Sequence, residues 1–160
     1  MSIEYNEDNL VEQATVDILA DIGWEIQTAW HNEIFGVNGN LGRENKSEVI
    51  LQKYLLVALE NLNPDLPQSA YKDAYFQIAG READKTLDRT NKEKYELIKS
   101  GVKVSFTNDK GELTKKTLKV FDFNNPDNNH FLAVRQLEVT GELYNRRPDV
   151  VGFVNGIPLV

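Results

Sequence analysis

Apolar residues recur at helical spacing in the first hundred residues of the chain and at alternating spacing afterwards. The helical pattern predicts helices over residues 8–22, 45–61 and 68–79, and a weaker, highly charged one that ends at Lys99. Gly101 follows the last of these as its terminator. Each helix is expected to turn its apolar face toward a shared core.

The first two helices are predicted to differ in burial. Asn45 and Glu48 resemble a capping box that opens the second helix. Its apolar residues then cover nearly the whole circumference, so it is predicted to be the central buried helix. The inward face of the first helix is predicted from Leu10, Val11, Ala14, Ile18, Leu19 and Ile22, and that of the third from Ala70, Ala74, Tyr75 and Ile78.

Alternation of large and polar residues predicts the strands. The predicted strands cover residues 24–30, 102–106, 113–123, 131–143, 150–154 and 157–160. We therefore expect an α+β domain over 1–160, with amino-terminal helices packed on a mostly antiparallel sheet. Its helical half would run to about residue 100, and a β-meander would occupy about 101–160.

Composition limits the classes of protein that fit. At 160 residues and 41% hydrophobic content the chain supports one ordinary core. It lacks cysteine and begins with the acidic run 1–8, which favours a cytoplasmic location. No apolar window approaches the roughly 18 residues of a membrane span. The 18 Lys and Arg against 25 Asp and Glu argue against a nonspecific coat on nucleic acid, although a local basic site remains compatible.

Three candidate ligand motifs fail on inspection. The glycine-rich segment 35–43 lacks the Lys-Ser or Lys-Thr pair that a P-loop needs directly after its last glycine. The segment 122–130 resembles a calcium loop, but Asp127 stands where that loop needs glycine, so an Asx-rich turn is predicted. His31 and His130 have no spacing typical of a metal site.

The last sixteen residues contain the strongest local signal. Asn155-Gly156 between apolar strands predicts a type I′ hairpin, in which Phe153 faces Pro158. Continuing this register, Asp149 should face a residue about two positions beyond Val160. On periodicity alone Asp149 is either a turn residue with local hydrogen bonds or a metal ligand, since two carboxylates on adjacent strands can hold Mg²⁺.

Several segments together resemble one family. They include Arg-Arg-Pro-Asp-Val-Val at 146–151, the segment 153–160, Asp-Phe-Asn-Asn-Pro at 122–126, the segment 129–136, and shorter matches upstream such as Leu-Gly-Arg at 41–43. The chain resembles the amino-terminal nuclease region of the type I restriction enzyme R subunit, a member of the PD-(D/E)xK group of nucleases. The likeness covers most of the chain.

The resemblance implies roles for named residues. Asp149 would be the first metal-binding acid, and the Glu-x-Lys pair is expected just after Val160. Glu12, otherwise a solvated helix residue, matches the position of a further acid in such nucleases. Arg146 and Arg147 would touch DNA phosphates, as would the predicted strand that carries Lys115, Lys116 and Lys119.

Two functions stay open from the sequence. By resemblance, the parent subunit cleaves double-stranded DNA with Mg²⁺, together with modification and specificity subunits, and uses ATP in motor domains outside this chain. Without the Glu-x-Lys pair, the chain alone is not expected to cleave DNA. The alternative is a noncatalytic module that docks the subunit on its partners, in which Asp149 is structural.

Overall fold

The computed structural model describes residues 7–80 and 84–159. Residues 1–6 of the acidic run, 81–83 of the charged stretch and Val160 of the last predicted strand lie outside the described residues. The chain forms two compact units, which are described separately: unit 1 comprises Met1–Leu51 and His130–Val160, and unit 2 comprises Gln52–Asn129. The single domain expected over 1–160 stays a prediction.

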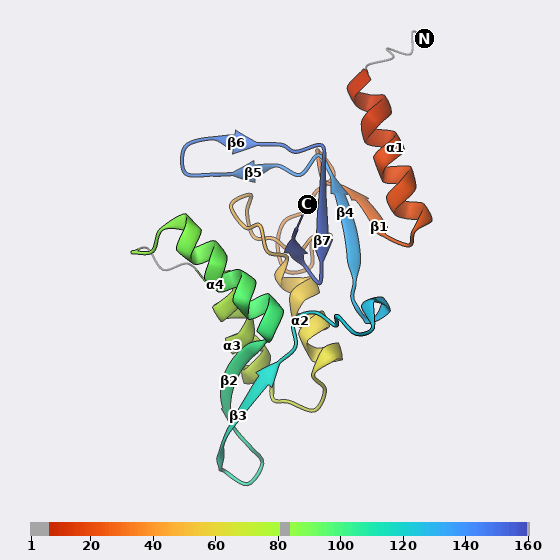
Figure 1. Ribbon diagram of the computed structural model, residues 1–160. Helices are drawn as coiled ribbons and strands as arrows, with labels where there is room; N and C mark the ends of the chain where they lie inside the picture. Colours follow the sequence, from red (N-terminus) through yellow and green to blue (C-terminus); the bar gives the residue numbers. More distant parts are fainter. Residues whose placement is uncertain (1–6, 81–83, 160) are drawn as a thin grey trace. The chain divides into compact units, whose positions relative to one another are not determined.

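Unit 1 is built on a four-stranded sheet with the order β1-β4-β7-β8. Its strands are β1 (Glu25–Thr28), β4 (Phe131–Arg135), β7 (Val150–Val154) and β8 (Ile157–Pro158). β1 runs parallel to β4, whereas the other pairs are antiparallel. A separate two-stranded ribbon joins β5 (Val139–Thr140) to β6 (Asn145–Arg146). Helix α1 (Glu7–Asp21) lies beside β1 (Figure 1). Together with unit 2, this gives a mixed α+β protein whose sheets are dominated by antiparallel pairs, as predicted.

The central strand β4 explains why the sheet forms here. Leu132, Ala133 and Val134 are all buried, which is the continuous apolar run expected of a strand paired on both sides. The strand predicted over 131–143 ends already at Arg135, because Gln136 takes the left-handed conformation with φ 52°. The chain then continues into the β5–β6 ribbon.

The terminal hairpin forms as predicted. Phe153 pairs with Pro158 and Val154 with Ile157. Asn155 and Gly156 both have positive φ, 51° and 80°, as a type I′ turn requires. Asn155 is also fully buried, and its Oδ1 accepts a 2.8 Å hydrogen bond from the backbone N–H of His130. The turn residue therefore anchors the start of β4 as well.

Asn155→Ala is expected to lower the free energy of unfolding of this chain by about 2–3 kcal/mol. Alanine costs more than asparagine at positive φ, and the buried N–H of His130 loses its acceptor. Urea denaturation measures the change. Asn125→Ala removes an exposed asparagine that makes no capping bond, and it should shift stability by less than about 0.5 kcal/mol. Equal losses in the two variants would contradict the role given to Asn155.

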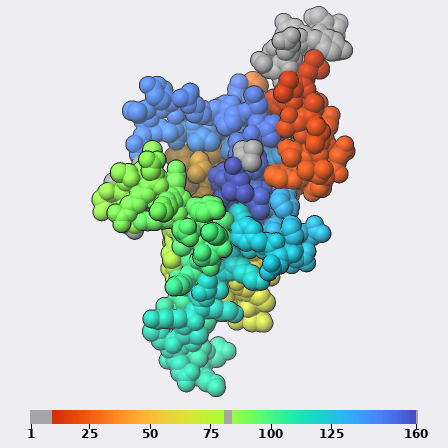
Figure 2. All heavy atoms as spheres, in the orientation of Figure 1, coloured from red at the N-terminus to blue at the C-terminus, as the bar shows by residue number. Residues whose placement is uncertain are grey.

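The predicted inward face of α1 is wrong. Leu10, Val11, Ile18 and Ile22 are between 54% and 69% exposed, whereas over residues 10–21 of α1 the buried side chains are those of Glu12 and Val16. The helix surface carrying these exposed apolar residues lies open to solvent in unit 1, and the helix is visible at the surface (Figure 2). The spacing of apolar residues predicted the wrong face because the side chain of Glu12 is buried against two polar partners, Arg135 on β4 and Gln136 just after it.

The described residues of unit 2, 52–80 and 84–129, form three helices, a hairpin and a short 3-10 turn. They are α2 (Gln52–Leu62), α3 (Gln68–Ala79), α4 (Leu87–Ser100), β2 (Val102–Thr107), β3 (Leu113–Leu118) and η1 (Pro126–Asn128). α3 contacts both α2 and β2. The predicted bounds of α3 are confirmed, and so is Gly101, with φ 89°, as the terminator of α4. The last residue of α4 is Ser100, one position beyond the predicted Lys99. Asn63 connects the unit internally by accepting from the N–H of Lys119 and donating to its carbonyl.

Four predictions about α2, α3 and β3 need correction. α2 begins at Gln52, because Asn45 and Glu48 cap a local turn instead: their side chains accept from the N–H groups of Ser47 and Glu44. The helix buries one face only. On α3, Tyr71 is buried whereas Tyr75 is only half-buried. The strand predicted over 113–123 ends at Leu118.

The Asx-rich turn predicted over 122–130 is confirmed. Asp122 Oδ1 accepts from the N–H groups of Asn124 and Asn125, and Oδ2 accepts from the side chain of Asn128. These bonds, the one from Asn128 first, hold the pKa of Asp122 below its ordinary value. Its oxygens are thus used by its own turn.

Among the helices that the structure describes, none has the length and apolar character to cross a membrane.

Candidate functional site

The candidate site lies in unit 1, where β4 ends and β7 begins. Arg135 on β4 pairs with Val150 on β7 in antiparallel register. The next residues, Gln136 and Asp149, therefore lie opposite each other, and the N–H of Gln136 donates to the carbonyl of Asp149 at 2.9 Å. Asp149 is exposed, so its carboxylate stands at the end of the sheet in contact with solvent.

Helix α1 brings a second carboxylate to this end of the sheet. Glu12 is buried, and its Oε1 accepts a 2.8 Å hydrogen bond from Nε of Arg135, with which it forms an ion pair. Gln13, one residue further along α1, accepts from Nη1 of the same arginine at 3.2 Å. The ion pair therefore compensates the burial of Glu12.

One amide group links the two acids. Nε2 of Gln136 donates to Glu12 Oε2 at 2.9 Å and to Asp149 Oδ1 at 3.1 Å. Glu12 and Asp149 were both candidates from the sequence, although they are far apart along the chain. The structure brings them to the two sides of a single glutamine side chain.

A buried arginine holds the loop beside this site. Arg43 is almost fully buried and forms a bidentate pair with Glu33, with Nε–Oε1 and Nη2–Oε2 distances of 2.7 and 2.6 Å. Its Nη2 also donates to the carbonyl of Glu138, two residues beyond Gln136, and Nη1 donates to that of Glu48. Arg43 therefore joins the glycine-rich segment to the chain that leaves β4.

A basic pocket of about 290 Å³ lies next to the start of β7. Its lining includes Lys46, Arg146 and Arg147, together with Glu138. Lys46 pairs with Glu138, and this hydrogen bond holds the pKa of Glu138 below its ordinary value. Arg147 stacks over the ring of Trp30 at 4.0 Å. Three cations and one carboxylate give the pocket a net positive charge. Arg147 precedes Asp149 by two residues in the sequence.

The comparison with known families decides the identity of this region. A family model described as the type I restriction enzyme R protein N terminus matches residues 4–160. The chain belongs to this family. The resemblance to the amino-terminal region of the R subunit is thereby confirmed, while membership of the PD-(D/E)xK group stays a prediction.

Two relatives of this restriction-enzyme chain align over nearly all of it. The type I restriction enzyme HindI endonuclease subunit of Haemophilus influenzae is 35% identical over 154 residues, which is 96% of this chain and 14% of the relative. The putative type I restriction enzyme MjaIXP endonuclease subunit of Methanocaldococcus jannaschii is 32% identical over 162 residues, with the same two shares. The chain thus spans about a seventh of the length of these relatives.

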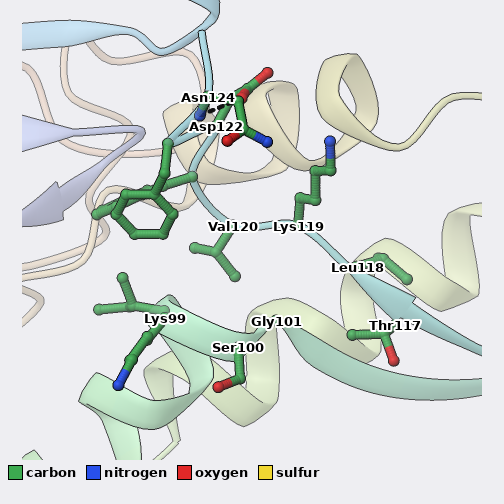
Figure 3. A pocket seen from close by; sticks show the side chains of 12 residues that line it. Lys99, Ser100, Gly101, Thr117, Leu118, Lys119, Val120, Asp122 and Asn124 are labelled. Atoms are coloured by element: carbon green, nitrogen blue, oxygen red, sulfur yellow. Dashed lines mark hydrogen bonds between the residues drawn. The ribbon is translucent and has the colours of Figure 1, made fainter. Parts of the chain in front are cut away.

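The lysines predicted to touch DNA belong to unit 2 of this R-protein region and do not form one cluster. Lys115 and Lys116 are consecutive on β3 and therefore point to opposite faces of the hairpin. Lys119 lies just past β3, not on it, and lines a pocket of about 190 Å³ with Lys99. The side chains of Lys99 and Lys119 point away from each other (Figure 3). They offer no common anion site there.

Within the described part of this restriction-subunit region, no three acidic, histidine or cysteine side chains cluster as metal ligands. Asp149 has the oxygen chemistry that Mg²⁺ prefers, and its Oδ1 is oriented by Gln136. Both oxygens of Glu12 already accept hydrogen bonds from Arg135 and Gln136. Asp149 is exposed and has the chemistry of a magnesium ligand, whereas Glu12 is buried beside it.

Sequence reasoning missed Arg135, Gln136 and Arg43 as members of the site of this R-protein region. A signal was present: Arg135 and Gln136 directly follow the apolar run of β4, where polar residues end a buried strand. The residue that lies opposite Asp149 could be identified only from the pairing register of β4 with β7. Arg43 belongs to the Leu-Gly-Arg match at 41–43, but nothing near it in the sequence indicated its burial or its partners.

Proposed function

We propose that the complete subunit containing this region cleaves phosphodiester bonds of double-stranded DNA with Mg²⁺, and that Asp149 is the first metal ligand. The bound ion would stabilise negative charge on the phosphate and lower the pKa of an attacking water. This chain supplies the oriented carboxylate. A Glu-x-Lys pair just beyond Val160 would supply a second carboxylate and a lysine that orients the water.

The exposed carboxylate of Asp149 is the observation that carries this proposal. It stands directly before strand β7, one of its oxygens is held by an amide donor, and β8 pairs with the far end of β7, so that a continued β8 would run toward Asp149. Adjacent strands bring ligands for one cation within reach of each other. A turn residue would instead accept hydrogen bonds from the N–H groups that follow it, as Asp122 does.

The basic pocket would bind DNA phosphates close to Asp149. Arg146, Arg147 and Lys46 line it, and arginine binds phosphate oxygens through paired N–H groups. The guanidinium group of Arg147 lies over the ring of Trp30, 4.0 Å from its centre, and that of Arg146 lies over the ring of Tyr144 at 5.5 Å. Phosphate binding at this position would bring the scissile bond toward the metal.

Replacing Arg146 and Arg147 together by alanine should weaken binding of a DNA duplex and flatten its salt dependence. Each lost phosphate contact removes about 0.9 from the slope of log K against log salt concentration. Fluorescence anisotropy of a labelled duplex with the complete subunit, over a salt series, measures both effects. Lys53→Ala removes another cation that lies over an aromatic ring, and it should leave the slope unchanged. An unchanged slope in the double variant would remove these arginines from the DNA site.

The parent assembly would include partners outside this chain. We propose that modification and specificity subunits select the DNA and that ATP is used by motor domains elsewhere in the same subunit. No ATP site is proposed for residues of this chain. The complex is proposed to act in the cytoplasm.

The experiment that tests the proposal is a Mg²⁺-dependent cleavage assay on plasmid DNA. It compares the complete subunit, assembled with its partners and ATP, with the Asp149→Asn variant. Undiminished cleavage by the variant would show that Asp149 does not serve as the metal ligand.

A docking function for the same region is favoured by a different observation. Leu10, Val11 and Ile18 on α1 and Ile22 just after it are large, apolar and exposed. Contiguous exposed apolar patches on a soluble protein often mark an interaction site. In that alternative the region attaches the subunit to its partners, and Asp149 has a structural role only. Replacing Val11 and Ile18 by glutamine would then disrupt assembly, measured by size-exclusion chromatography, while Asp149→Asn would leave cleavage intact.

A further inference from the structure

We infer that Gln136 is a positioning residue that orients the Asp149 carboxylate toward the metal, and that Glu12 acts through Gln136. This inference deepens the proposed function and rests on it. Its basis is the single amide group that lies between the two acids, Glu12 on one side and Asp149 on the other.

The amide of Gln136 uses both of its donor hydrogens on carboxylate oxygens. One goes to Glu12 Oε2 at 2.9 Å and the other to Asp149 Oδ1 at 3.1 Å. The opposite orientation of the amide would place its carbonyl oxygen between two carboxylates, which cannot donate to it. The orientation is therefore fixed by its neighbours, and Asp149 Oδ1 always meets a donor.

Glu12 supplies the fixed side of this arrangement. Its carboxylate is buried and is held by Arg135 through an ion pair of 2.8 Å. Both of its oxygens accept hydrogen bonds from Arg135 and Gln136, and its burial leaves it less accessible to a cation than the exposed Asp149. Glu12 therefore serves to hold the amide, and the amide in turn holds Asp149.

The consequence for Asp149 is a preferred direction of binding. With Oδ1 held by Gln136, the other oxygen is the one presented to a cation at the end of the sheet. Partners that orient a metal-binding carboxylate typically contribute a factor of about 10–100 in metal affinity or activity. Gln136 should therefore set how tightly the ion binds.

The backbone at Gln136 supports a role for this particular side chain. Its φ of 52° lies in the left-handed region, which glycine and asparagine occupy more easily than glutamine. A residue held in such a conformation commonly marks a functional position. Here the conformation turns the chain out of β4 while its N–H still bonds to Asp149 O, so backbone and side chain contact the same residue.

The test uses Gln136→Met in the complete, assembled subunit. Methionine has a similar length but no donor hydrogens. We expect the Mg²⁺ concentration for half-maximal cleavage to rise about 10-fold or more, with a smaller change in the rate at saturating Mg²⁺. Binding of Mn²⁺ without DNA, followed by the electron paramagnetic resonance signal of the free ion, should weaken by a similar factor.

A matched control makes the same chemical change elsewhere. Gln77→Met on α3 removes an amide that donates to the carbonyl of Lys103. It should leave Mg²⁺ dependence and Mn²⁺ binding as in the parent, whatever it does to the melting temperature. A purely structural role for Gln136 would likewise alter melting without altering either metal measurement.

The outcomes separate this inference from the proposed function. If Asp149→Asn abolishes cleavage but Gln136→Met keeps the parent's Mg²⁺ dependence and Mn²⁺ binding, Gln136 does not position the ligand. If Asp149→Asn cleaves as well as the parent, the proposed function fails, and the role of Gln136 fails with it. Should Gln136→Met not fold, Gln136→Asn suits the positive φ and is too short to bridge both acids. Unchanged metal binding in that variant would equally overturn the inference.

Discussion

Asp149→Asn is expected to lower Mg²⁺-dependent DNA cleavage by the complete subunit by about 10³-fold or more. Asparagine has nearly the same shape and still accepts a hydrogen bond from Gln136, but it lacks the negative charge that binds Mg²⁺. A correctly held metal ion contributes several kcal/mol to transition-state stabilisation, and each 1.4 kcal/mol corresponds to about tenfold in rate. The loss should therefore appear in the cleavage step.

Two controls accompany the Asp149 prediction. Asp127→Asn changes another exposed acid, on η1 of unit 2, and should leave the cleavage rate unchanged. The melting temperature of the Asp149 variant should stay close to that of the parent, because its side chain is exposed. A variant that melts normally and retains more than about a tenth of parental cleavage would refute the assignment.

Arg43→Met is expected to lower the free energy of unfolding of this chain by about 3–5 kcal/mol. Its guanidinium group is fully buried, and it donates to Glu33 and to the carbonyls of Glu48 and Glu138. Methionine fills part of the space but leaves the largely buried carboxylate of Glu33 without its cation. Removing one partner of a buried ion pair is among the most damaging single changes.

Urea denaturation of this chain measures the Arg43 effect, and two further variants interpret it. Arg89→Met breaks an exposed pair with Glu93 on α4, which should cost less than about 0.5 kcal/mol. Adding Glu33→Gln to Arg43→Met removes the isolated charge and should restore part of the lost stability. If Arg43→Met is no worse than Arg89→Met, the buried network does not stabilise unit 1.

The sequence predicted those parts of the fold whose signals are local. The terminal hairpin was readable because Asn155-Gly156 specifies a turn by its own backbone preference. The bounds of α3 and the end of α4 at Gly101 were readable for the same reason. The parallel pairing of β1 with β4 was not, since nothing near either strand encodes a partner from the other end of the chain.

Two of the errors, on α1 and before α2, share one physical origin. Apolar periodicity assigns burial to apolar residues, whereas on α1 the buried side is defined by Glu12 and its partner Arg135. Likewise, Asn45 and Glu48 form side-chain bonds to their neighbours that look like a helix cap in the sequence but close a turn. The spacing of apolar residues does not predict which polar side chains are buried or turned inward by hydrogen bonds to distant or neighbouring residues.

The candidate site was predictable only in part. Asp149 was identified because it precedes a strand of a recognisable hairpin, but the sequence did not decide between turn residue and metal ligand. Gln136 became visible once the β4–β7 register placed it opposite Asp149. Glu12 reaches Gln136, and through it Asp149, only because α1 packs beside the sheet. That packing is a property of the folded unit and is not encoded near any of the three residues.

The arrangement of the two units along the chain has a consequence for biosynthesis. Unit 2 is one continuous segment, whereas the sheet of unit 1 pairs β1 with a strand that is translated only after all of unit 2. Contacts between such distant segments form slowly, and a chain leaving the ribosome folds its early complete segments first. Unit 2 should therefore fold before β4 has been synthesised and can pair with β1. Chains terminated between residues 130 and 148 would contain a folded unit 2 and no contact between Gln136 and Asp149.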